Sequence, residues 1–297
     1  MPRLMAASTK MCRRMVLRRR LSTTGTTSST SDVSSIDPTI MANVLQGPSI
    51  LHTSHFRSCP SLMMLPGLRS LPFWTSWDGT SNRIAYQDPA ISFICQYMES
   101  HVATIQSEYL VAKELLISDY ATGSEHASSL HSGTWDWYSY MMHGILQNEF
   151  STHFPKTCSI LQPLLEQGHL LQGIPFGFAF ISNLHGNSTI AAHTSPLNFR
   201  LRLHLPLIVP TEQGVGIRVG PVTQSWNSGK AMVLDDSYNH EVWNHTNEER
   251  VIFLMDLWHP DVTHDEREEI KRMFAHAKER GWIGGNHKHV NDDAAQK

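Results

Sequence analysis

The chain is short of cysteine, of charge and of long apolar runs, and each shortage excludes a class of protein. Its four cysteines, among 297 residues, form no Cys-x-x-Cys pair, so neither a zinc ribbon nor a small disulfide-stapled fold is expected. No stretch of about 18 apolar residues occurs, so no integral membrane segment is expected. Only 17% of the residues are charged and the formal net charge is −3, so no nucleic-acid partner is indicated. By contrast, 40% of the residues are hydrophobic, as in globular proteins, and 18 are histidines, the commonest metal-binding side chain.

Acidic residues are also absent from the first 31 positions, which contain seven basic residues and eleven serines and threonines. This composition is typical of an organelle transit peptide. We therefore predict that residues 1–58 form a transit-peptide-like, disordered segment and that the protein is mitochondrial, with plastid or cytoplasmic localisation as alternatives. A disordered tail with no targeting role is the other interpretation of the same composition. Residues 286–297 are predicted to form a second disordered tail.

Residues 59–285 are predicted to form one domain, which opens with a helix. Asp88-Pro89 is a typical helix start, because a capping carboxylate precedes proline at the first helical position. Apolar residues three and four positions apart extend this helix to about Ser118. Residues 120–155 are rich in Gly, Ser, Trp and Tyr but show no clear period, so they carry no prediction of secondary structure.

In the second half of the chain the apolar period shortens to two, which is typical of strands. Turn-forming segments separate the runs, and the pattern predicts short strands at 178–182, 199–207, 216–219, 231–234 and 250–257. A closing helix is predicted to begin at Thr263 and to end near Gly281. The sequence therefore predicts a mainly β protein with flanking helices (α+β), arranged as a sandwich or jelly roll.

One predicted strand carries an unusual cationic face. Residues 199–205 read Phe-Arg-Leu-Arg-Leu-His-Leu, so Arg200, Arg202 and His204 share one face and the apolar residues share the other. An amphipathic strand with a solvated face is the simpler interpretation. The choice of arginine and histidine at all three positions instead suits a cavity that holds carboxylates, so a small anionic ligand is the alternative hypothesis.

Two histidines and an arginine surround this strand in the sequence. His193 precedes it and His240 lies far beyond it, a separation that a jelly roll permits for two ligands of one metal. Arg250 begins a strongly apolar run, where a buried guanidinium needs an anion or a salt bridge to offset its loss of hydration.

The chain from His193 to Pro260 resembles the aspartyl/asparaginyl β-hydroxylase family of Fe(II)- and 2-oxoglutarate-dependent dioxygenases. The matching segments read HTSPLNFRLRLHLPLIVP, IRVG, SWNSGKAMVLDDSYNHEVWN and RVIFLMDLWHP. Weaker similarity extends over most of residues 60–265. The resemblance implies a double-stranded β-helix, or cupin-like jelly roll. It also implies hydroxylation of an unactivated carbon with Fe(II), 2-oxoglutarate as cosubstrate and O2.

The resemblance also assigns roles around the cosubstrate. Arg250 corresponds to the arginine that pairs with the distal carboxylate of 2-oxoglutarate, and Ser182 corresponds to a serine that hydrogen-bonds the same group. Arg202 and His204 correspond to residues near the carboxylate beside the keto group. These assignments agree with the cationic face inferred from the strand pattern.

The resemblance makes His193 and His240 the two iron ligands and leaves the usual third ligand missing. An Asp or Glu two residues after the first histidine would complete a facial triad, but Ser195 stands there. Known members of the family also lack this carboxylate, so water, or Ser195 itself, would fill the position. Asp235 and Asp236 are the nearest carboxylates in sequence to His240, and we interpret both as turn and hydrogen-bonding residues.

The substrate does not follow from the sequence. An Asp, Asn or other side chain of a protein or peptide is the first hypothesis, and the same chemistry on a lipid acyl chain or a small amide is the second. A degenerate, non-catalytic jelly roll that binds carboxylates is the third. We expect residues 120–155, where the resemblance is loosest, to contact the substrate. No feature of the sequence fixes an oligomeric state.

Overall fold

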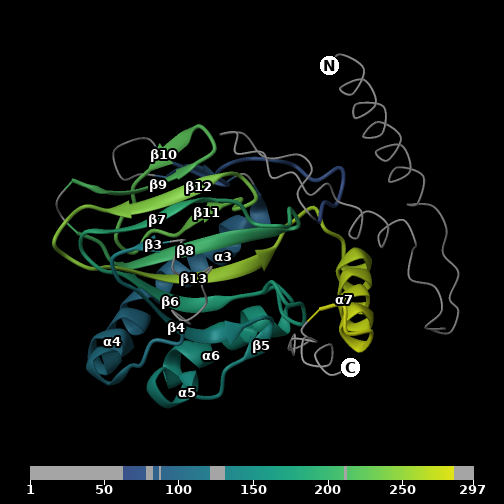
Figure 1. Ribbon diagram of the computed structural model, residues 1–297, viewed down its shortest axis with the longest axis horizontal. Coiled ribbons are helices and arrows are strands. Elements are labelled where there is room, and N and C mark those ends of the chain that lie inside the picture. The colour runs from purple at the N-terminus through teal and green to yellow at the C-terminus, as the bar shows by residue number, and fades with distance from the viewer. Residues whose placement is uncertain (1–62, 78–82, 87, 121–130, 211–212, 284–297) are drawn as a thin grey trace, which may run out of the picture.

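The chain folds into two facing antiparallel sheets with helices along one side (Figure 1). The computed structural model describes residues 63–77, 83–86, 88–120, 131–210 and 213–283. The two predicted disordered segments, 1–58 and 286–297, lie outside this part of the chain. The strands are β1 (Thr75–Trp77), β2 (Arg83–Tyr86), β3 (His131–Ser132), β4 (Trp135–Met142), β5 (Ile145–Leu146), β6 (Ala179–Leu184), β7 (Ser188–His193), β8 (Arg200–Ile208), β9 (Val215–Val219), β10 (Val222–Gln224), β11 (Met232–Leu234), β12 (His240–Asn244) and β13 (Arg250–Trp258).

The large sheet has the strand order β11-β8-β13-β6-β4-β5, and the small sheet has the order β10-β9-β12-β7-β3. Neighbouring strands are antiparallel in both sheets, and strands far apart in sequence lie side by side, as in a jelly roll. A separate hairpin pairs β1 with β2. The prediction of a mainly β jelly roll with flanking helices is therefore confirmed.

The two faces of β8 pack against different layers. Leu201, Leu203 and Leu205 belong to the apolar cluster that the large sheet forms with the helices. Arg202 and His204 point the other way, into the space between the sheets. His204 is buried and the Arg202 side chain is only 16% exposed, so the interpretation of this face as a solvated surface was wrong and the face lines a cavity.

The helices cover the outer face of the large sheet and one end of the molecule (Figure 1). None of the helices in the described residues is long and apolar enough to cross a membrane. Their bounds are α3 (Pro89–Ser100), α4 (Val102–Ala112), α5 (Phe150–His153), α6 (Pro155–Glu166) and α7 (His264–Glu279), with a 3-10 turn at Lys113–Leu115.

The single helix predicted from Asp88 to about Ser118 is in fact two helices. Asp88 caps α3 as expected, since its side chain accepts a hydrogen bond from the Ala90 amide. The break lies at His101, whose Nδ1 donates to the Tyr97 carbonyl oxygen at 2.8 Å. That carbonyl would otherwise accept the His101 amide, which bonds to the Met98 carbonyl instead. A side-chain hydrogen bond to the backbone thus interrupts the helix, and apolar spacing cannot reveal it.

The closing helix agrees with its prediction at both ends. Thr263 and Glu266 form a reciprocal capping box at the start of α7. Gly281, with a φ of +70°, follows the last turn, where a left-handed conformation ends a helix at little cost for glycine. The apolar side of α7 packs into a separate cluster with Phe199 and Trp258.

Candidate active site

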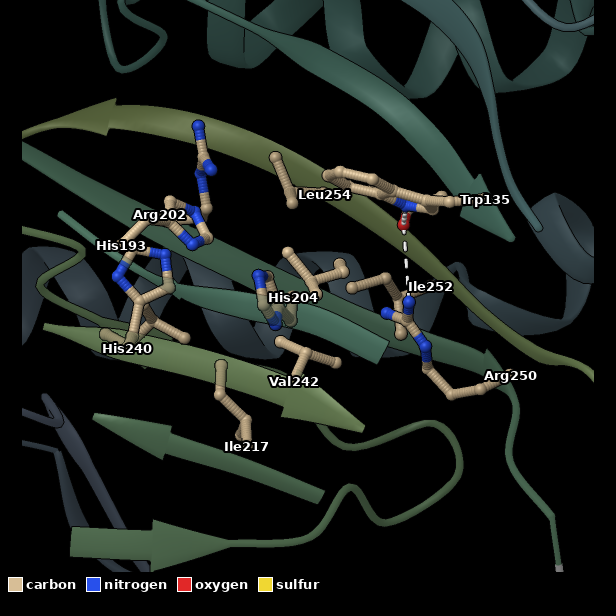
Figure 2. A pocket seen from close by; sticks show the side chains of 13 residues that line it. Trp135, His193, Arg202, His204, Ile217, His240, Val242, Arg250, Ile252 and Leu254 are labelled. Atoms are coloured by element: carbon tan, nitrogen blue, oxygen red, sulfur yellow. Dashed lines mark hydrogen bonds between the residues drawn. The ribbon is translucent and has the colours of Figure 1, made fainter. Parts of the chain in front are cut away.

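A cavity lies between the two sheets, with polar groups at both ends and apolar walls between them. Figure 2 shows His193 and His240 together at one end and Arg250 at the other, with Ile252, Leu254 and Val242 between. The strand pattern had placed only the cationic face in such a cavity. The structure brings all six candidate residues to its lining, namely Ser182, His193, Arg202, His204, His240 and Arg250.

The two histidines come from neighbouring strands of the small sheet. His193 is the last residue of β7, His240 is the first residue of β12, and the two are register partners in that ladder. Their ring centroids are 4.1 Å apart. Strand pairing therefore places two imidazoles side by side that are far apart in the sequence.

Hydrogen bonds to the backbone fix which nitrogen of each ring faces outward. His193 Nδ1 lies 2.8 Å from the Ala191 carbonyl oxygen, and His240 Nδ1 lies 2.9 Å from the Tyr238 carbonyl oxygen. A carbonyl oxygen only accepts hydrogen bonds, so Nδ1 carries the proton in both rings and Nε2 keeps its lone pair. Burial lowers the pKa of His193, and burial followed by repulsion from His193 lowers the pKa of His240 to about 3. Both rings are therefore neutral at physiological pH.

This donor set fits a divalent transition metal with two protein ligands. Neutral imidazoles whose Nδ1 protons are held by carbonyl groups are the usual form of metal-binding histidine. Within the described residues, no group of three or more His, Cys, Asp or Glu side chains is arranged to hold a metal ion. The pair would thus act without a third charged ligand, and the remaining coordination positions would be open to water and small ligands.

Arg250 lies at the opposite end of the cavity from the two histidines. Its side chain is among the largest fully buried ones, and its Nη2 donates to the Ser182 hydroxyl at 3.5 Å. Its Nε has no hydrogen-bond partner, and no carboxylate of the described residues forms an ion pair with it. Burial lowers the pKa of Arg250 to about 9, which leaves the guanidinium charged at neutral pH. A buried cation without a protein anion is suited to bind an anionic ligand.

His204 lies between these two ends and also keeps a free polar atom. Its Nδ1 accepts a hydrogen bond from Trp226 Nε1 at 3.3 Å, whereas its buried Nε2 has no partner. Burial, followed by repulsion from Arg202 and Arg250, holds the pKa of His204 well below its ordinary value. The neutral ring therefore carries its proton on Nε2, where it can donate to a ligand in the cavity.

Two arginines of the cationic face are already paired with carboxylates of the protein. Arg202 Nε donates to Asp256 at 2.8 Å, and Arg200 Nη2 donates to Asp236 at 2.5 Å. Arg200 also bonds to Asp256 at 3.2 Å, and Arg202 lies 3.5 Å from Asp236. The anions that this face was expected to hold are thus, in part, internal aspartates. A role for Arg202 toward a cosubstrate stays a prediction.

These ion pairs of Arg200 and Arg202 correct the interpretation of one of the two aspartates before His240. Asp235 accepts from the amide and the hydroxyl of Ser237, which is the expected turn. Asp236 is instead a buried partner of the arginines, and its carbonyl oxygen accepts from the Ser195 amide at 2.8 Å. The Ser195 hydroxyl accepts from Arg200 at 2.8 Å. Asp236 therefore connects the segment that follows His193 to the segment that precedes His240.

We expect Asp236→Asn to lower the free energy of unfolding by about 3–5 kcal/mol, because it removes one charge from a buried ionic network. Burial alone would raise the pKa of Asp236, but Arg200 and Arg202 outweigh it and hold the pKa well below its ordinary value. Since the unfolded pKa is about 3.9, this stabilisation is complete above that pH and is lost as the pH falls toward the folded pKa. Urea titrations of both proteins at several pH values measure it.

Glu241→Gln is the matched control for that charge. Glu241 pairs with Arg218 at 2.6 Å, but its side chain is 41% exposed. Solvent screens such a pair, so the expected change in unfolding free energy is within about 1 kcal/mol. Equal effects of the two substitutions would contradict a special contribution from the buried network.

Sequence reasoning missed two tryptophans that contact the cavity residues. Trp135 lines the cavity and donates from Nε1 to the Ser182 hydroxyl at 2.8 Å, and it belongs to no motif of the sequence analysis. It belongs to the segment 120–155, whose richness in tryptophan was the only signal. Trp226 lies in a segment that matches the family, but its composition indicated a turn and no role was predicted for the indole. In both cases the indole N–H serves a polar residue of the site.

Comparison with known protein families agrees with this geometry. The sequence model of the Aspartyl/Asparaginyl beta-hydroxylase family matches residues 99–260, which is more than half of the chain. The chain belongs to this family. All six candidate residues lie within the match, and the resemblance inferred from the sequence is confirmed.

Individual relatives in the family cover different parts of the chain. The aspartyl/asparaginyl beta-hydroxylase of Mus musculus is 30% identical over 221 residues, which are 73% of this chain and 27% of the mouse protein. The ornithine lipid ester-linked acyl 2-hydroxylase of Rhizobium tropici is 42% identical over 83 residues, which are 28% of this chain and 30% of that protein. The chain thus spans about a quarter of the length of the mouse β-hydroxylase.

A solved prolyl-4-hydroxylase from Pseudomonas putida is similar to 54% of this chain and to 86% of its own, with 10% sequence identity and a TM-score of 0.33. So loose a superposition supports no statement about the site. The jelly roll rests on the strand order above, and the assignment of the chain to a hydroxylase family rests on its sequence.

Proposed function

We propose that this β-hydroxylase family member is an Fe(II)- and 2-oxoglutarate-dependent dioxygenase that hydroxylates an unactivated carbon in a side chain of a protein or peptide, such as that of Asp or Asn. One observation carries the proposal. A single cavity has two neutral imidazoles with free Nε2 atoms at one end and, at the other, a buried arginine that pairs with no carboxylate of the described residues. A chelating keto acid with a second carboxylate has the complementary chemistry.

The two ends of the cavity would have separate tasks. His193 and His240 would hold Fe(II) through Nε2, and the bound metal would supply the oxidising chemistry with O2 and the keto acid. Arg250 and the Ser182 hydroxyl would bind the distal carboxylate, with Trp135 fixing the orientation of that hydroxyl. Because these groups are in place before a ligand arrives, binding needs little reorganisation.

The walls of the cavity would keep the reaction away from bulk water. Ile190, Ile217 and Val242 of the small sheet face Ile252 and Leu254 of the large sheet. Such surfaces strengthen electrostatic contacts at both ends, because they lower the local dielectric constant. They offer no hydrogen bonds to the middle of the ligand, which suits the methylene groups of 2-oxoglutarate.

A lipid acyl chain is the second candidate substrate. The acyl 2-hydroxylase of R. tropici is 42% identical over its matched segment, a higher value than the 30% of the mouse β-hydroxylase over its longer one. Mass spectrometry decides between the two. Incubation with Asp- and Asn-containing peptides and, separately, with acylated lipids shows which class gains one oxygen atom.

Anaerobic addition of Fe(II) and 2-oxoglutarate is the central test of the proposed chemistry. We expect a weak visible charge-transfer band that requires both additions, because it arises from chelation of the metal by the keto acid. On admission of oxygen, slow release of succinate without any substrate should follow. A band that saturates without any succinate would favour a non-catalytic carboxylate-binding jelly roll. Absence of the band would contradict the proposed cosubstrate.

A further inference from the structure

Trp226 connects two of the cavity residues and lies outside both metal-binding strands. It sits in the loop between β10 and β11, and its side chain is only 3% exposed. Two hydrogen bonds hold this loop: the Ser225 hydroxyl donates to the Val215 carbonyl at 2.5 Å, and the Gly229 amide donates to the Pro206 carbonyl at 2.9 Å. These bonds fix the backbone of the loop, and the indole packs in the apolar cluster that residues of both sheets form.

The indole N–H determines the hydrogen-bonding role of His204. Trp226 Nε1 can only donate, so at 3.3 Å from His204 Nδ1 it requires that nitrogen to accept. The single proton of the neutral imidazole must then reside on Nε2. This atom is buried, lines the cavity and has no partner of its own in the described structure. The hydrogen bond at Nδ1 thus leaves the Nε2–H group of His204 as a donor that faces the cavity.

The ring face of the same tryptophan contacts Arg250. The guanidinium carbon lies 5.0 Å from the indole centroid, within range of a cation–π interaction. The indole and imidazole rings are nearly parallel, with an angle of 29° between their planes. Trp226 consequently touches two cavity groups through different parts of its side chain, the N–H for His204 and the π face for Arg250.

We propose that Trp226 is a positioning residue that holds His204 in the Nε2–H tautomer, so that His204 donates a hydrogen bond to a carboxylate of the cosubstrate in the cavity. This inference rests on the proposed function for the identity of the anion. The tautomer itself depends only on the two side chains. In the opposite tautomer the His204 Nδ1–H would point at the Trp226 Nε1–H. The Nε2 atom would then present a lone pair, instead of a proton, to the anion.

Trp226→Phe separates the two contacts, because phenylalanine keeps an aromatic face for Arg250 but lacks the N–H. The first measurement is the ¹⁵N spectrum of histidine-labelled, metal-free protein, with His204 assigned by the loss of its signals in His204→Gln. In the wild type we expect a protonated Nε2 and an unprotonated Nδ1. In Trp226→Phe both signals should move toward the averaged values of an imidazole that exchanges between tautomers.

The second measurement is the affinity for 2-oxoglutarate by calorimetry on the Fe(II)-loaded protein without oxygen. We expect Trp226→Phe to weaken binding by about tenfold, the usual effect of impairing one hydrogen bond to a charged group. In the His204→Gln background the amide donor needs no tautomer, so Trp226→Phe should then change the affinity little. Trp258→Phe is the control, since that buried tryptophan lies in the cluster beside α7 and does not line the cavity.

Each alternative result decides the inference. A wild-type spectrum with the proton on Nδ1 would overturn it without any variant. An equal loss of affinity in the wild-type and His204→Gln backgrounds would also overturn it, by showing that Trp226 acts through Arg250. If the wild type binds no 2-oxoglutarate, the proposed function fails, while the spectrum of the ligand-free protein still supports or refutes the fixed tautomer.

Discussion

Alanine at either His193 or His240 is expected to abolish iron binding and turnover while leaving the protein folded. Two protein ligands leave no redundancy, so a single imidazole cannot retain the ion at micromolar concentrations. The fold should persist because the side-chain hydrogen bond of each ring joins it only to a carbonyl two residues earlier, at Ala191 and Tyr238. Metal analysis after gel filtration, with circular dichroism of the same samples, measures both properties.

His185→Ala provides the matched control. This histidine follows β6, bonds to Asp136 at 2.7 Å and does not line the cavity. Its removal should leave the iron content unchanged. Iron content equal to wild type in His193→Ala or His240→Ala would count decisively against the two-histidine site.

Removal of the charge at Arg250 is expected to have the second-largest effect. Arg250→Ala should weaken 2-oxoglutarate binding on the order of a hundredfold or more, because the buried carboxylate of the ligand would lose the guanidinium that pairs with it. Iron binding should be unaffected, since Arg250 and the histidines lie at opposite ends of the cavity (Figure 2). Equal affinity in the wild type and in Arg250→Ala would show that another residue holds the carboxylate.

Two further substitutions at this position separate charge from geometry. Arg250→Lys keeps the charge but loses the planar fork, so the KM for 2-oxoglutarate should rise more than kcat falls. Arg250→Met should make the metal-free protein more stable to urea, because it removes a buried cation that no carboxylate of the described residues compensates. A stabilised protein that cannot bind cosubstrate is the signature of a residue kept for function.

Local sequence patterns were sufficient for the parts of the fold where one strand face is uniformly apolar. The alternation in β8 predicted its leucine face and placed Arg202 and His204 together on the other face, while only the choice of arginine and histidine favoured a cavity over solvent for that face. The start of α7 was likewise predicted at Thr263, where the structure has a capping box. Such features depend on residues near one another in the chain.

Features that depend on distant residues did not follow from local patterns. The strands β7 and β12 and their pairing were not predicted, and only the family resemblance assigned His193 and His240 to one site. The ion pair of Asp236 with Arg200 was missed because an aspartate beside a serine also suits a turn. Trp226 was missed because nothing in a loop sequence indicates which way an indole points. Each of these contacts is set by tertiary packing.

The pairing of β7 with β12 also has a kinetic consequence. The two imidazoles meet only when strands far apart in the chain have found their register, and β12 must fit between β7 and β9. Such long-range contacts form slowly, and an unfolded chain offers a metal no preformed pair of ligands. If the pair forms after the folding transition state, iron would leave the refolding rate unchanged and would slow unfolding instead. The metal would then extend the lifetime of the native protein without helping it to form.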